Sequence, residues 1–116
     1  MRKQSEVTKK FDVEFLEEAM SFLDQMDDKA REKIIYNIRK AQVTLDKELF
    51  KKLVDDIWEF RTLYNRTYYR LFAFWDKKDG METVVISTHG LIKKTGKTPK
   101  GEIEKAKRIR NQYFDK

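Results

Sequence analysis

The apolar residues of this chain change their spacing near residue 57, and this change constrains the fold more than any other feature. Before it, apolar residues recur at helical spacing in two consecutive stretches, residues 15–26 and 30–45. After it, residues 57–64 and 68–75 alternate with period two, and a β-branched run follows at residues 82–88. This order predicts a helical hairpin packed on a meander of three antiparallel strands.

Turn and capping residues set the boundaries of these elements. Asp27-Asp28 ends the first helix and supplies an N-cap for the second. Residues 65–67 form a short hairpin loop, and Asp79-Gly80 closes the second hairpin. Thr98 as N-cap and Pro99 at the first helical position start a final helix, whose apolar stripe packs on the sheet or meets a partner.

The remaining segments complete an α+β chain. Residues 11–15 alternate and predict a short first strand, whereas residues 46–56 are expected to add a helical turn through Leu49, Phe50 and Leu53. The predicted order is β-α-α-β-β-β-α, in one domain of residues 1–116. The small antiparallel or mixed sheet is covered on one face by the helical hairpin.

Composition excludes several classes of site. The chain has no cysteine, which excludes a disulfide, a thiol nucleophile and a cysteine-ligated zinc site. A single histidine excludes a histidine-rich metal site. The first residues lead into no apolar signal segment, and no stretch approaches the roughly 18 apolar residues of a membrane span. We therefore expect a cytoplasmic protein with no membrane contact.

Positive charge is concentrated in the second half of the chain. Residues 1–60 carry 12 Lys/Arg against 14 Asp/Glu, a net charge of −2, whereas residues 61–116 carry 14 against 6, a net charge of +8. The excess does not lie on one amphipathic helix, so nucleic acid is favoured over a membrane as the polyanionic partner. Net charge alone is equally compatible with a protein that is basic without such a partner.

A basic loop follows the β-branched strand. That strand is predicted to end at His89, and no acid occurs between Thr83 and Gly101. Local acids normally neutralise lysines in a solvated loop, so their absence leaves a positive potential that attracts phosphates. The lysines of this segment are Lys93, Lys94, Lys97 and Lys100.

The meander places charged residues on the sheet face opposite the helical hairpin. If Trp58 and Phe60 meet the helices, then Glu59, Arg61 and Arg70 lie on the other face, close enough to act together. The alternative is that Glu59 pairs with one of the arginines and that both arginines are solvated. For His89, a hydrogen-bonded structural role stands beside a catalytic one.

These residues resemble a known family. Glu59-Phe60-Arg61 and Tyr69-Arg70 look like its second and third strands, and residues 89–99 followed by 102–106 look like its closing motif. The family is the HigB-like branch of the RelE superfamily, the toxins of toxin–antitoxin pairs, including phage-derived members. Leu91 stands where members more often have Phe, and Gly96 where they have Gln.

The resemblance implies a RelE-like fold and a ribosome-dependent messenger-RNA endonuclease that needs no metal or other cofactor. Two arginines suit a phosphate clamp, since a guanidinium offers a planar fork. A histidine titrates near ~6.5, and neighbouring lysines lower one another's pKa. The implied catalytic residues are Arg61, Arg70, His89 and Lys93, and the implied RNA-binding residues are Lys94, Lys97 and Arg66.

The resemblance also implies partners. These are messenger RNA on the ribosome and a HigA-like helix-turn-helix antitoxin that silences the toxin. Two alternatives stand beside the enzyme: a non-catalytic nucleic-acid-binding module that uses the same basic face, and an interaction protein whose function is to bind its antitoxin.

Overall fold

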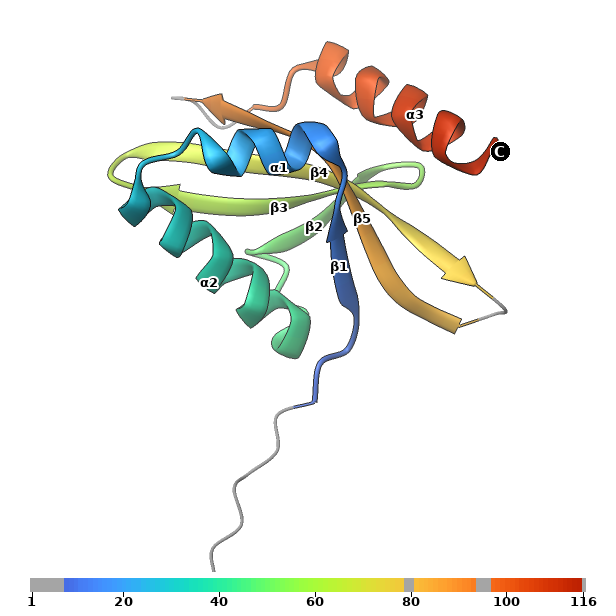
Figure 1. Ribbon diagram of the computed structural model, residues 1–116, viewed down its shortest axis with the longest axis horizontal. Coiled ribbons are helices and arrows are strands. Elements are labelled where there is room, and N and C mark those ends of the chain that lie inside the picture. Colours follow the sequence, from blue (N-terminus) through green and yellow to red (C-terminus); the bar gives the residue numbers. More distant parts are fainter. Residues whose placement is uncertain (1–7, 79–80, 94–96, 116) are drawn as a thin grey trace, which may run out of the picture.

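The computed structural model describes residues 8–78, 81–93 and 97–115, and it confirms the α+β class (Figure 1). Within these residues, five strands form one mixed sheet in the order β1-β5-β4-β3-β2. Strand β1 runs parallel to β5, and every other neighbouring pair is antiparallel. The elements are β1 (Asp12–Phe15), α1 (Glu17–Asp24), α2 (Asp28–Thr44), β2 (Phe50–Val54), β3 (Ile57–Tyr64), β4 (Thr67–Lys78), β5 (Met81–Lys93) and α3 (Lys100–Phe114).

Strand β2 corrects the sequence prediction, which placed a helical turn through Leu53. Phe50 instead begins an edge strand whose register pairs it with Phe60 of β3. The two phenyl rings stack with centroids 4.5 Å apart, and the Phe50 ring also stacks on Trp58 at 4.7 Å. Aromatic packing across the strands therefore overrides the helical spacing, and the sheet gains one strand over the predicted number.

Helices α1 and α2 cover one face of the sheet, as predicted (Figure 1). The Asp27 carboxylate accepts the Ala30 backbone N–H at 2.9 Å, which confirms the predicted N-cap of α2. The apolar stripe of α2 is buried against Phe60, Leu71 and Ala73 of the central strands. The main core therefore lies between the helical hairpin and the sheet.

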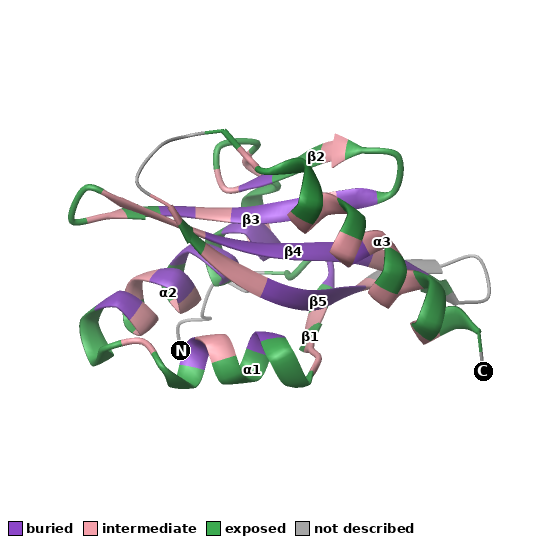
Figure 2. Ribbon diagram, turned by 90° about the horizontal axis from the view of Figure 1, so that it is seen from above, coloured by how far each residue is buried: buried purple, intermediate pink, exposed green. Residues whose placement is uncertain are grey.

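Helix α3 covers the opposite face, which confirms the first of the two predictions for its apolar stripe, packing on the sheet. Ala106 of α3 is buried against Ile57 and Phe72, and Ile103 packs beside them. The Tyr113 hydroxyl donates to the Asp76 carboxylate at 2.7 Å, so the carboxyl end of α3 is also fastened to β4. The apolar stripe of α3 thus packs on the sheet, and Figure 2 shows the buried strand segments between the helices.

Strand β5 is longer than predicted and contains a bulge. It continues through His89 to Lys93, which pairs with Tyr68 of β4. The register shifts because Phe72 pairs with His89 whereas Ala73 pairs with Ser87, so Thr88 is an additional residue. His89 is therefore an interior residue of the strand and faces α3.

Of the two predicted hairpin turns, the structure describes the first. Asn65 and Arg66 both have positive φ, 53° and 62°, as the two-residue turn of a twisted hairpin requires. The predicted turn residues Asp79 and Gly80 lie outside the described residues.

Candidate functional site

The strand register brings the predicted catalytic residues onto one face of the sheet. This is the face that α3 partly covers, and its side chains come from alternate positions of β3, β4 and β5. Three successive rows cross these strands: Glu59, Phe72 and His89; then Arg61, Arg70 and Leu91; then Leu63, Tyr68 and Lys93. Arg61, Arg70, His89 and Lys93 therefore share the face that the sequence assigned to the two arginines.

A buried carboxylate joins the two arginines. Glu59 and Arg70 are 1% and 2% exposed, and Arg70 Nη1 lies 3.0 Å from Glu59 Oε2. Arg61 Nε lies 3.4 Å from the same oxygen, while 30% of the Arg61 side chain remains exposed. The alternative interpretation is therefore confirmed for the pairing of Glu59 with the arginines. It is wrong for the solvation of Arg70, and Arg61 is the partly exposed member of the pair.

Thr98 connects this ion pair to the segment before α3. Arg70 Nη1 donates to the Thr98 hydroxyl at 2.6 Å, and that hydroxyl lies 3.4 Å from Glu59 Oε1. Thr98 is consequently not the N-cap of α3; Pro99 occupies that position, without a side-chain hydrogen bond. The Thr-Pro pair signalled a helix start correctly, but the Thr98 hydroxyl is used by the ionic cluster.

His89 is buried inside a hydrogen-bonded pocket. It is 3% exposed and its ring stacks on Phe72 with centroids 4.8 Å apart. Its Nε2 lies 3.0 Å from Glu102 Oε1, and its Nδ1 lies 2.8 Å from the Thr88 hydroxyl. Burial lowers the pKa of His89 below its ordinary value, and the hydrogen bond to Glu102 opposes that shift.

The hydrogen bonds assign the tautomer of the neutral ring. A carboxylate only accepts, so His89 Nε2 carries the proton and donates to Glu102. Nδ1 then accepts from the Thr88 hydroxyl. Both ring nitrogens are engaged, and the exposed member of the pair is Glu102, whose side chain is 33% accessible.

Sequence reasoning missed Glu102 and Thr98 as members of this cluster. Glu102 was noted only as an acid in the first turn of the final helix. The available signal was its position directly after the basic loop, where a helix that packs back on the sheet brings its first turn towards His89.

The lysine loop is described in part. Lys93 Nζ donates to the Lys97 carbonyl oxygen, so the structure brings these two predicted residues together. Lys97 is exposed and Lys93 is half-buried. Arg66 is exposed in the β3–β4 turn, at the end of the sheet where Lys93 also lies. Lys94 lies outside the described residues.

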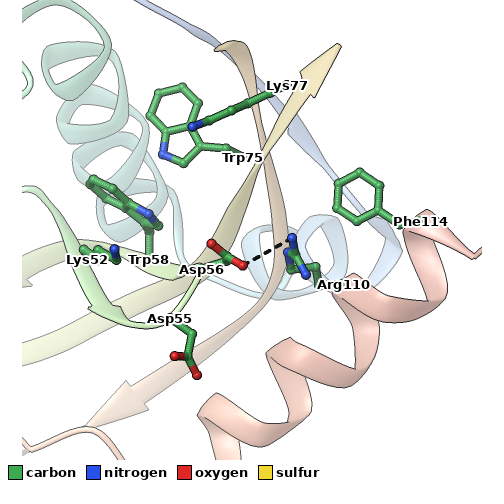
Figure 3. Close-up of a pocket in the computed structure, with 8 residues that line it drawn as sticks. All are labelled: Lys52, Asp55, Asp56, Trp58, Trp75, Lys77, Arg110 and Phe114. Atoms are coloured by element: carbon green, nitrogen blue, oxygen red, sulfur yellow. Dashed lines mark ion pairs between the residues drawn. The ribbon is translucent and has the colours of Figure 1, made fainter. Parts of the chain in front are cut away.

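One cavity adjoins this cluster, and another lies away from it. A cavity of about 470 Å³ lies beside Arg61 and Tyr68. A second, of about 390 Å³, lies at the other end of β3 between Trp58, Trp75 and the end of α3 (Figure 3). In it Arg110 pairs with Asp56 at 3.3 Å, and none of the predicted catalytic or RNA-binding residues lines it.

Metal-binding clusters and membrane-spanning helices are both absent from the described part of the chain. No group of three or more histidine and acidic side chains there is arranged to hold a metal ion. No helix there is long and apolar enough to cross a membrane.

A comparison with models of protein families finds a match over most of the chain. The family model described as phage-derived protein Gp49-like (DUF891) matches residues 21–111, which include every element from within α1 to most of α3. No curated protein matches the chain.

Proposed function

Because the chain belongs to the Gp49-like family of phage-derived proteins, part of the RelE-like toxin superfamily, we propose that it is the toxin of a type II toxin–antitoxin pair, of the HigB-like kind. Its proposed activity is metal-independent cleavage of messenger RNA on the translating ribosome, which stops protein synthesis. The observation that carries the proposal is the placement of Arg61, Arg70, His89 and Lys93 on one sheet face beside the start of α3.

The proposed reaction needs an attacking hydroxyl, a base, an acid and positive charge. The ribose 2′-hydroxyl attacks the adjacent phosphorus in line, and a base takes its proton. The bond to the 5′-oxygen breaks, an acid protonates that oxygen, and a cyclic phosphate remains on the other fragment. Cations stabilise the extra negative charge of the pentavalent transition state.

The structure supports a specific division of these roles. Arg61 is accessible and contacts the reacting phosphate, while the buried Arg70 acts as a positioning residue that holds Glu59 and Thr98. His89 and Glu102 form the proton-transferring pair. Lys93, Lys97 and Arg66, together with Lys94, bind the flanking phosphates.

Translation arrest tests the proposal. Induction of the chain alone should stop incorporation of labelled methionine, and primer extension should locate breaks in a translated reporter message. Arg61→Ala should reduce cleavage on the order of 100- to 1000-fold, the usual loss for a transition-state contact of ~2.7–4 kcal/mol. Arg39→Ala is the matched control, because Arg39 is an exposed arginine of α2 outside the cluster. Continued synthesis with confirmed expression of the folded protein would exclude the toxin activity.

We also propose a helix-turn-helix antitoxin as the silencing partner. Its support is the family membership and the net charge of +8 over residues 61–116, which favours an acidic partner surface. Co-expression with the product of the adjacent reading frame should restore growth and yield a complex on size exclusion. A neighbouring product that neither co-purifies nor restores growth would contradict the pairing.

One observation favours a second candidate, a non-catalytic RNA-binding module. Arg70 and His89 are only 2% and 3% exposed, and each is engaged by a carboxylate. Such a module keeps the accessible cations of Arg61, Lys93 and Lys97 without chemistry at His89. RNA binding that persists without any cleavage, in translation extracts as well as in purified form, would favour this candidate over the enzyme.

A further inference from the structure

A basic cavity lies at the edge of β3, next to the candidate site. Strand β2 pairs with β3 only as far as Phe60, and beyond it Arg61 N–H donates to the Leu49 carbonyl at 2.8 Å. Among the described residues, no strand covers that edge from Thr62 to Tyr64. The cavity of about 470 Å³ between this edge and α2, which we call the edge cavity, is therefore bounded by side chains of α2, β3 and β4.

The walls of the edge cavity are cationic. Lys33 and Lys40 of α2 and Arg61 of β3 line it, against the single acid Glu48. Within the part of the chain that the structure describes, neither lysine forms an ion pair with a carboxylate. The two lysines are seven residues apart on one helix, which separates them by about 10 Å along the axis, so they can meet different phosphates.

The floor of the cavity is polar and already fixed. Asn37 Nδ2 donates to the Thr62 hydroxyl at 3.1 Å, and both residues are buried. This hydrogen bond ties α2 to β3, so Lys33 and Lys40 project from a helix that is held in place. The site is thus preformed and needs no rearrangement of the backbone to receive a ligand.

An aromatic ring and a shared arginine connect the edge cavity to the candidate site. Arg61 lines the cavity and also lies 3.4 Å from Glu59. The half-buried Tyr68 lines the cavity as well, and the Arg70 guanidinium lies 5.6 Å from the centre of its ring. Cations that follow a backbone beside an aromatic platform for a base are typical of single-strand binding sites.

We propose that the edge cavity binds the sugar–phosphate backbone of RNA, with Lys33 and Lys40 on successive phosphates beyond Arg61 and a base against Tyr68. The inference rests on the proposed function, because it extends the path of the RNA strand from the candidate cleavage site around the edge of β3 onto α2. This path adds α2 to an interface otherwise built from the second half of the chain.

The test compares two double variants by fluorescence anisotropy with a short, uncleavable single-stranded RNA at several salt concentrations. Lys33→Ala with Lys40→Ala should flatten the slope of log affinity against log salt by about 1.4, since each phosphate contact with a single strand contributes about 0.7. Lys10→Ala with Lys47→Ala is the matched control, because both are exposed lysines that line a different cavity, next to Leu45 and Phe50. A change no larger than that of the control, both with this oligonucleotide and with purified ribosomes, overturns the inference.

Two arms distinguish the source of the RNA. If the salt slope of the Lys33→Ala, Lys40→Ala variant flattens with the free oligonucleotide, the bound strand is messenger RNA. If it flattens only with purified ribosomes, the bound strand is ribosomal RNA. Both results support backbone binding by the edge cavity. Message cleavage is measured in parallel. Salt-dependent binding that needs both lysines, without cleavage by the wild type, contradicts the toxin proposal alone. Wild-type cleavage with an unchanged slope in the double variant contradicts only the edge cavity.

Discussion

Arg70 and Glu59 form an ion pair whose two side chains are almost completely removed from water, at 2% and 1% exposure. Breaking such a pair leaves an uncompensated charge in the protein interior, which costs more than the pair itself contributes. Arg70 therefore stabilises the fold as well as the site, and its replacement does not report on chemistry alone.

We expect Arg70→Ala to lower the free energy of unfolding by about 3 kcal/mol, at the low end for a broken buried pair because Arg61 remains 3.4 Å from Glu59. Urea denaturation measures this loss. Replacing both partners with methionine should recover much of it, since no buried charge remains. Unchanged stability of Arg70→Ala would show instead that Arg70 is a solvated strand residue, as one interpretation of the sequence had it.

His89 should make stability depend on pH in a defined direction. Burial lowers its pKa in the folded protein below the value of 6.5, with the Lys105 charge acting in the same direction and Glu102 and Glu18 opposing. The unfolded chain therefore binds the proton more readily, and stability rises with pH. The contribution is fully present above about pH 6.5 and is lost as pH falls through the folded pKa.

The measurement is the free energy of unfolding of the wild type and of His89→Gln across this range of pH. The difference between the two should shrink as the solution is acidified, because only the wild type must protonate a buried imidazole. A difference that stays constant from about pH 5 to pH 7 would mean that His89 is not held neutral by burial.

At the scale of elements, the approach of α1 to β5 depends on Gly90. A Cβ built on Gly90 would lie 2.3 Å from the ring of Phe22, closer than any normal contact. Gly90→Ala should therefore cost about 1–3 kcal/mol through overpacking. Gly101→Ala is the control: it lies in the first turn of α3 with nothing within 4 Å of the new methyl group, and it should gain about 0.4–1 kcal/mol.

Thermal unfolding of the two alanine variants measures this contrast. Opposite shifts of the midpoint are expected, downward for Gly90→Ala and upward for Gly101→Ala. Equal midpoints would indicate that Phe22 moves away from β5 without cost.

The elements with a strong period could be predicted from sequence, and the others depended on distant contacts. Both helices of the hairpin, β3, β4 and α3 follow from their apolar spacing. Strand β2 could not be predicted, because Leu49, Phe50 and Leu53 also fit a helix and the strand exists through its pairing with Ile57–Phe60. The strand was predicted to end at His89, whereas β5 continues through Gly90, which has no side chain and so leaves room for Phe22.

The sequence predicted which face of the sheet carries the candidate site, but not which residues surround the site or how deeply it is buried. Alternation along β3 and β4 assigns Arg61 and Arg70 to one side of the sheet. What covers that side depends on how α3 packs back, which brings Thr98 to Arg70 and Glu102 to His89. No local pattern encodes these long-range contacts, so the burial of Arg70 and His89 is visible only in the structure.

At the scale of the whole molecule, the sheet separates the main hydrophobic core from the charged residues of the candidate site. The helical hairpin and the stacked rings of Phe50, Trp58 and Phe60 build the main core on one face. The opposite face carries α3 and the ionised side chains. Ion pairs also join α3 to distant parts of the chain, from Lys105 to Glu18 at 2.7 Å and from Arg110 to Asp56 at 3.3 Å. The charged face is thereby attached to the first helix and to the β2–β3 turn.

The order of the strands also bears on self-association. The long, apolar β4 and β5 lie inside the sheet, and the outer strands β1 and β2 have only 4 and 5 residues. Arg61 lies where the pairing of β2 with β3 ends, and Lys93 lies on β5 beyond the residues that pair with β1. Charges on a strand edge oppose edge-to-edge pairing between molecules, so these cations guard against fibril growth as well as facing a ligand. Apolar replacements there favour aggregation, which size exclusion of each variant detects before its activity is compared with that of the wild type.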